Sequence, residues 1–166
     1  MMGASGRRLR SVLRALHVVF SIGWAGSVAV FLVVAAAGWA SPDARIWAGV
    51  YAALQVTMWW AVVPLAGLSL LTGIGVSLVT RWGLTRHYWV LFKLVLTVVA
   101  TGALVLHTGV ADTAAHASLQ VGMDFSAVRL QLMVDAVAAL VVLVVVMILG
   151  FVKPRGTTPW AARPVS

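Results

Sequence analysis

Four histidines and four aspartates are the side chains of this protein that could do acid–base or metal chemistry, because the sequence has neither cysteine nor glutamate. The absence of cysteine excludes thiolate metal sites, iron–sulfur clusters and cysteine nucleophiles. The sequence also lacks a phosphate-binding loop, a serine-hydrolase elbow and a zinc-protease helix motif. Any chemistry therefore depends on how these side chains are grouped: His17, His87, His107, His116, Asp43, Asp112, Asp124 and Asp135.

Sequence spacing divides the histidines into two groups. His87 and His107 are about twenty residues apart, which is roughly 30 Å along a continuous helix, so they cannot both bind one ion. We therefore place His17 with His87 in an inner group. The outer group consists of His107, Asp112, His116 and Asp135.

The inner group could hold a b-type haem, in which imidazoles from two neighbouring helices bind the iron and cations meet the propionates. His17 and His87 would be the ligands, and the positive charge would come from Arg14, Arg81, Arg86 and Lys93. A simpler interpretation is that His87 anchors a membrane interface beside aromatic residues and that His17 is a helix contact.

The outer group favours two kinds of chemistry. A His107–Asp135 pair could exchange protons, and the same two residues could bind a divalent transition metal together with His116 or Asp112. We expect His107 and Asp135 to lie at similar depths, because each is a turn or two inside a polar helix end. The alternative without chemistry is that Asp135 reaches interfacial water or pairs with Arg129.

The composition predicts a membrane environment for these groups. With 62% hydrophobic residues, 10% charged residues and a mean hydropathy of +1.03, the chain has too little polar surface for a water-soluble globule. The net charge of +8 comes from short basic clusters between uncharged runs. This pattern is typical of the flanks of membrane helices. We expect a lipid bilayer as the partner, and no nucleic acid.

Long uncharged runs predict an all-α bundle of four transmembrane helices, at about residues 15–40, 47–80, 88–110 and 128–152. The second run is too long for one upright span, and Pro64 permits either a kinked helix or a surface turn followed by a span. Polar residues predict a loop over 111–128. Lys93, near the start of the third span, is expected to extend its ammonium group back to the headgroups.

The distribution of charge predicts that both termini lie in the cytoplasm. Most cations fall on the side of the termini and of the stretch 81–93, whereas the aspartates lie on or near the other side. By the positive-inside rule, the cationic side faces the cytoplasm. We expect a multi-pass protein of a bacterial plasma membrane, with one domain over residues 1–156 and a disordered cytoplasmic tail over 157–166.

A row of small residues in the second span predicts close helix packing. Ser69, Gly73 and Ser77 recur every four residues, and Gly23 and Ser27 repeat this spacing in the first span. Such rows let helix backbones approach closely in lipid. They could also support a homodimer or leave room for a flat cofactor.

Three motifs stand out beside these residues: Trp82 to Val90 continued by Lys93 and Thr97, His17 followed by Gly23-Trp24, and Lys153 to Gly156. Together they resemble a family of small four-helix membrane proteins from actinobacteria. The resemblance covers about residues 10–156 and implies a plasma-membrane protein with four spans, but no activity. The first helix is also loosely similar to the copper-resistance D and small b-type cytochrome membrane families. Members of the actinobacterial family tend to have histidine where this chain has Asp135, which argues against histidine-ligated haem in the outer half.

The sequence therefore predicts a small membrane redox module that binds haem b or a divalent transition metal. Two alternatives stay open: a small proton-linked transporter that uses His107 and Asp135, and an accessory membrane subunit without catalysis. Whether the chain is an enzyme is left open.

Overall fold

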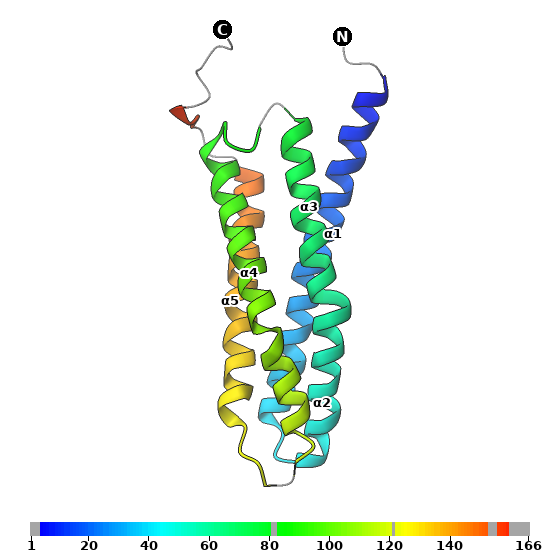
Figure 1. Ribbon diagram of the computed structural model, residues 1–166, viewed down its shortest axis with the longest axis vertical. Coiled ribbons are helices and arrows are strands. Elements are labelled where there is room, and N and C mark those ends of the chain that lie inside the picture. Colours follow the sequence, from blue (N-terminus) through cyan, green and yellow to red (C-terminus); the bar gives the residue numbers. More distant parts are fainter. Residues whose placement is uncertain (1–3, 81–82, 121, 153–155, 160–166) are drawn as a thin grey trace.

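The computed structural model describes residues 4–80, 83–120, 122–152 and 156–159, and that part of the chain is all-helical. Long helices run side by side between two ends, which we call the inner end, where α1 begins, and the outer end (Figure 1). The helices are α1 (Ala4–Ala40), α2 (Ala44–Thr57), the π-helical η1 (Met58–Val62), α3 (Val63–Val79), α4 (Tyr88–Ala117) and α5 (Ser126–Val152).

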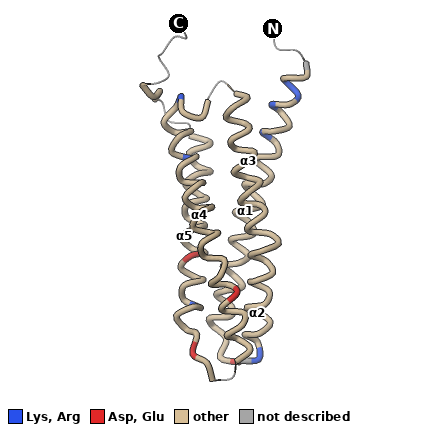
Figure 2. The backbone as a smooth tube through the Cα atoms, in the orientation of Figure 1, with Lys and Arg blue, Asp and Glu red and all other residues tan. Residues whose placement is uncertain are grey.

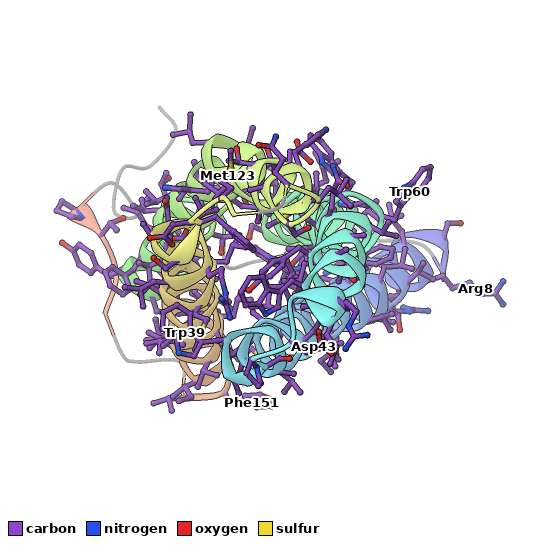
Figure 3. All side chains as sticks on the ribbon, turned by 90° about the horizontal axis from the view of Figure 1, so that it is seen from below. Arg8, Trp39, Asp43, Trp60, Met123 and Phe151 are labelled. Carbon is purple, nitrogen blue, oxygen red and sulfur yellow. The ribbon has the colours of Figure 1, made fainter. Side chains whose placement is uncertain are left out.

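Four helical stretches are long and apolar enough to cross a membrane: Ser5–Ala40, Arg45–Val79, Tyr88–Ala117 and Ser126–Val152. This confirms the prediction of an all-α chain with four long apolar helices. Large apolar side chains cover the outside of the bundle; Trp60, for example, is 81% exposed and projects away from the helices (Figure 3). A continuous apolar exterior of this kind is a surface for lipid or for other proteins.

The second stretch is one continuous helical run through α2, η1 and α3, and not a surface turn followed by a span. Its irregular part is η1, after which the Val63 N–H donates to the Met58 carbonyl, one residue further back than in an α-helix. Pro64 follows at once, and proline has no N–H and clashes with the carbonyl of the preceding α-helical turn. The wider π turn gives the proline ring that room.

Small residues bring α1 close to α3. A Cβ atom added to Gly73 would lie 2.9 Å from His17 Cε1, so only glycine lets that ring lie against the α3 backbone. One turn away, the buried Ser69 shares a hydrogen bond of 2.8 Å with the Ser21 hydroxyl. The small-residue row therefore packs within the chain, and the homodimer stays a prediction.

Helix α4 is longer than the sequence indicated, because residues 111–117, which were expected in a loop, are helical. Ala111, Ala114 and Ala117 are buried there, and small side chains at helical spacing let this end of α4 approach α2. The polar residues that predicted a loop lie on other faces of the same helix. Polar residues such as Asp112 and His116 therefore occur in the outer end of α4 without ending the helix.

Helix α5 begins at Ser126, where Asp124 caps it. The Ser126 N–H donates to Asp124 Oδ1 over 2.9 Å. This bond stabilises the charged carboxylate and lowers the pKa of Asp124 below its usual value. The connection from the end of α4 at Ala117 to the start of α5 at Ser126 is therefore short and lies at the outer end of the bundle (Figure 1).

Charged residues differ between the two ends of the bundle (Figure 2). The outer half holds every aspartate of the chain, together with Arg45 and Arg129. The other described cations lie toward the inner end: Arg7, Arg8, Arg10, Arg14, Arg86 and Lys93.

Thr158 is held against the loop that precedes α4. Its N–H donates to the Arg86 carbonyl (3.1 Å) and its hydroxyl donates to the Thr85 carbonyl (2.6 Å). The side chain is buried by these contacts. The tail that was expected to be disordered from residue 157 thus begins with a segment in a defined place, and residues 160–166 lie outside the described part.

Candidate functional site

Arg129 closes the outer end of the bundle, although the sequence indicated it only as a candidate partner of Asp135. Its Nε donates to the Tyr51 hydroxyl (2.9 Å), and its Nη2 donates to the carbonyls of Gly38 (2.6 Å) and Trp39 (3.0 Å). These carbonyls belong to the last turn of α1, where the helix dipole attracts a cation. Among the described residues, no ion pair joins Arg129 to Asp135.

Aromatic rings surround the same guanidinium group. Its Cζ atom lies 4.5 Å from the centroid of the Trp47 ring and 5.3 Å from that of Trp39. Phe125 packs edge-on against Trp47 and Tyr51, with centroids 5.5 and 5.4 Å apart. These contacts join α1, α2 and the start of α5. We call the set the Arg129 cluster: Gly38, Trp39, Trp47, Tyr51, Phe125 and Arg129.

His107 and Asp135 line one cavity of about 240 Å³, which we call the middle cavity. The two residues come from α4 and α5, and the structure brings them together as their expected depths predicted. Trp24 contributes an indole group from α1. The rest of the lining is apolar and comes from α1, η1, α4 and α5.

The polar atoms of the middle cavity are sparsely bonded. Asp135 Oδ2 is buried, and no described residue supplies a hydrogen-bond donor to it. His107 Nδ1 lies 2.8 Å from the Ala103 carbonyl, and because a carbonyl only accepts, this nitrogen carries a proton. No hydrogen bond or ion pair joins His107 to Asp135 in the described part of the chain. The cavity therefore holds a carboxyl group and an imidazole that are not hydrogen-bonded to each other.

The other two residues of the outer group lie elsewhere. Asp112 Oδ1 accepts hydrogen bonds from Gln55 Nε2 (2.8 Å) and Trp59 Nε1 (3.0 Å), which ties α4 to α2 and η1. His116 is exposed, with Nδ1 2.7 Å from the carbonyl of Asp112. Because α4 is continuous, His107 and Asp112 point roughly 140° apart around its axis. In the described ranges, no three His or Asp residues are grouped closely enough to hold a metal ion.

An open cleft of about 420 Å³ lies toward the inner end, between the α1–α3 pair and the α4–α5 pair. Figure 1 shows these two pairs farther apart at this end than at the outer end. Arg14 and His17 line the cleft from α1, Lys93 from α4 and Met147 from α5. We call it the inner cleft. Its described lining includes no aspartate, and most of it is apolar.

His17 lines the inner cleft, and one of its ring nitrogens is bonded to α3. Its Nδ1 lies 3.1 Å from the Ser69 carbonyl and 3.3 Å from Thr72 Oγ1. The carbonyl requires a proton on Nδ1, so Nε2 is the nitrogen that is left for a ligand. Gly73 makes this position accessible to the ring, as described above.

The half-buried Lys93 side chain reaches from α4 to α5 near the inner end, and its extension to lipid headgroups stays a prediction. A Cβ atom added to Gly150 would lie 2.9 Å from Lys93 Nζ, so the ammonium group rests against the α5 backbone. A side chain at position 150 would displace it. The sequence signal for this arrangement is a glycine that faces a lysine on a neighbouring helix. Such a signal can be recognised only when the neighbouring helices are known.

His87 does not line the inner cleft beside His17 in the described part of the chain. His87 precedes α4, forms an isolated antiparallel bridge with Thr157, and is not part of the inner-cleft lining. Of the cations expected near haem propionates, Arg14 and Lys93 line the cleft, Arg86 does not, and Arg81 lies outside the described residues. Of the two predicted haem ligands, the structure thus places His17 in the cleft lining and His87 outside it.

Trp24 separates the two spaces. It is 2% exposed and lines both the inner cleft and the middle cavity, with Leu143 and Ala136 buried on α5. Reading from the inner end, the bundle therefore contains an open cleft, a buried indole, a small cavity with a carboxyl group, and the closed Arg129 cluster. The sequence placed Trp24 inside a span without indicating this position.

No protein-family model matches this chain, and the comparisons with curated proteins and with solved structures found no match either.

Proposed function

We propose that this chain is a four-span protein of a bacterial plasma membrane, with its inner end and both termini in the cytoplasm. The apolar exterior of four long helices supports the membrane, because such a surface is stable in lipid and not in water. The excess of cations at the inner end supports the orientation through the positive-inside rule.

We propose further that the protein is a small proton-linked permease, with Asp135 as its proton-binding group. The observation that carries this proposal is the buried Oδ2 atom of Asp135, for which no described residue supplies a donor. Asp135 lies roughly 14 Å along α5 from its first residue, which is hydrocarbon depth for a helix that spans a bilayer. A carboxylate there costs several kcal/mol, and a bound proton removes that cost. Protonation therefore changes which arrangement of the helices is the most stable.

Few charges act on Asp135. His107 faces it across the middle cavity from α4, whereas the lining from α1 and η1 is apolar apart from the Trp24 indole. Arg129 lies on the same helix but is bonded to Tyr51 and to the end of α1. His107 is therefore the one ionisable side chain that lines the middle cavity beside Asp135 in the described part of the chain.

The order of the cavities supports a transport path. A ligand could enter the inner cleft from the cytoplasm and reach Trp24, beyond which the middle cavity holds the proton-binding group. The Arg129 cluster seals the other end. This arrangement is that of an inward-open state with a closed outer end.

A cofactor-binding redox module is the second candidate. His17 lines the inner cleft and its Nε2 makes no hydrogen bond to a described residue, and Met147 lines the same cleft from α5. Histidine and methionine are one of the residue pairs that hold haem iron. A reducible Soret band in the purified protein that His17→Ala removes would favour this candidate over the permease.

Flux measurements test the permease. We would reconstitute the protein into vesicles and measure the uptake of a panel of labelled organic anions, cations and neutral compounds with and without an imposed pH gradient. We expect at least one compound whose uptake rises with the gradient and falls at least tenfold in Asp135→Asn. The variant should still exchange that compound between equal pH values, because only the coupling step needs the proton.

The matched control is Asp124→Asn, which alters a carboxylate outside the spans. Asp124 caps α5 in the outer connection and lines neither cavity, so its removal should leave gradient-driven uptake unchanged. Gradient-driven uptake that is the same in wild type and Asp135→Asn would contradict the proposal, as would a panel in which no compound responds to the gradient.

A further inference from the structure

The charge and lining of the inner cleft identify a class of ligand. We propose that the cleft binds an organic anion with an apolar body, such as a medium-chain carboxylate, with its charged group near Arg14 and Lys93 and its apolar part toward Trp24. Binding of this anion does not depend on the proposed permease. Only the statement that the anion is the transported substrate rests on it.

The cations of the cleft come from two sides. Arg14 reaches it from α1, Lys93 reaches it from α4, and the described lining contains no aspartate to balance them. Every aspartate of the chain lies in the outer half (Figure 2). A ligand carboxylate between the two helices therefore meets positive potential from both walls, and a ligand cation is repelled.

Polar groups lie just below these cations on the α1–α3 wall. The Ser21 and Ser69 hydroxyls bond to each other over 2.8 Å, so one hydroxyl proton is still available to a ligand. His17 adds its Nε2, which accepts a hydrogen bond when neutral and donates one when protonated. The polar end of a ligand thus finds charge and hydrogen-bonding groups together near the mouth of the cleft.

The remaining depth of the cleft is apolar. From Arg14 to Trp24 the cleft extends roughly 15 Å along α1, at about 1.5 Å per residue. Ile22, Leu70 and Leu143 line it over that depth. Its volume of about 420 Å³ lies within the range of roughly 300–1,000 Å³ that is common for small-molecule sites. A single apolar body fits this shape better than a fully polar anion, whose solvation the deep part cannot replace.

Binding can be measured through the indole groups of the cleft. We would place the intact protein in nanodiscs of phosphatidylcholine, titrate decanoate, and follow tryptophan fluorescence, with empty nanodiscs as the control for partition. Decanol and decyltrimethylammonium are the matched neutral and cationic probes. We expect a saturable change for decanoate, at least tenfold weaker binding of the other two probes, and loss of most of the signal in Trp24→Phe.

The cations of the cleft should determine this affinity. Lys93→Gln and Arg14→Gln should each weaken decanoate binding about tenfold, the effect of losing one charge-assisted contact. Lys93→Arg keeps the charge and should retain most of the affinity. Arg8→Gln is the matched control, because Arg8 lies on α1 outside the cleft and points away from the bundle (Figure 3), and it should leave the affinity unchanged.

Several outcomes would overturn the assignment. One is equal affinity for decanoate and decanol, and another is decanoate binding that is indifferent to both glutamine variants. Native mass spectrometry could also find a bound phosphatidylglycerol molecule that is lost in Lys93→Gln. If decanoate does not displace that molecule, the cleft is a phospholipid site. A Soret band in the purified protein would make it a haem site.

The binding and flux results separate this inference from the permease. Decanoate that binds as expected, together with a panel in which no compound shows uptake dependent on Asp135, would remove the permease and leave the anion site. Gradient-driven uptake of some other compound, dependent on Asp135 and without decanoate binding, would remove the anion site and leave the permease.

Discussion

Arg129 shows how a residue's role can depend on partners that sequence spacing does not indicate. Its hydrogen-bond partners Tyr51, Gly38 and Trp39 are 78, 91 and 90 positions away along the chain. The sequence indicated a pairing with Asp135 as one alternative, beside contact of Asp135 with interfacial water. The end of α1 offers a better partner, since its last carbonyls lack helical donors and carry the negative end of the dipole.

We predict that Arg129→Gln lowers the free energy of unfolding by about 3 kcal/mol. The substitution removes the charge-assisted hydrogen bonds to the carbonyls of Gly38 and Trp39. It also removes the guanidinium donor from the buried Tyr51 hydroxyl. Thermal unfolding in nanodiscs, followed by near-UV circular dichroism, should show a Tm several degrees lower.

Arg45→Gln is the matched control for Arg129. Arg45 also lies at the outer end, but its side chain is 92% exposed and its ion pair with Asp43 is 3.3 Å long. Exposed pairs of this kind contribute roughly 0–1 kcal/mol. If the two variants lose the same stability, Arg129 is not the residue that closes the outer end.

At the scale of helices, hydropathy predicted the four long apolar elements, and polarity misplaced the outer end of α4. Residues 111–117 were expected in a loop because Asp112 and His116 lie there, yet the alanines between them are buried in α4. Polar side chains at a helix end can meet partners on a neighbouring helix, as Asp112 meets Gln55. Such contacts depend on which helices are adjacent, and a single sequence does not give this information.

The contact between α1 and α3 leads to a prediction with a control on the same helix. Gly73→Ala should destabilise the protein by about 1–3 kcal/mol, because the added Cβ would lie 2.9 Å from His17 Cε1 and the ring is held by Ser69 and Thr72. Gly67→Ala adds the same atom where nothing lies within 4 Å, and alanine is the better helix former.

Thermal unfolding of the two variants measures this difference. We expect a lower Tm for Gly73→Ala and an unchanged or higher Tm for Gly67→Ala. A Tm for Gly73→Ala at or above that of wild type would mean that His17 moves without cost, and that the small-residue row does not hold this ring in the inner cleft.

At the scale of the whole molecule, the two ends of the bundle differ in both charge and packing. The sequence predicted the charge difference, because it follows from counting cations between apolar runs. It did not predict that the cationic end would be open and the other end closed by Arg129, because both properties depend on how the helices diverge (Figure 1). The open cleft therefore lies at the cationic end, which is the cytoplasmic end in the orientation proposed above.

The orientation of the whole molecule is open to a direct test, since the chain has no cysteine and any introduced thiol is unique. Gln120→Cys places a thiol in the exposed connection between α4 and α5 at the outer end, and Thr85→Cys places one in the loop before α4 at the inner end. In intact bacterial cells, a membrane-impermeant maleimide should label the first variant and not the second, and permeabilised cells should label both. The positive-inside rule sets this expectation, because the cations near residue 85 are retained on the cytoplasmic side. Labelling of Thr85→Cys alone in intact cells would invert the bundle and place the inner cleft outside the cell, where it could no longer take a substrate from the cytoplasm.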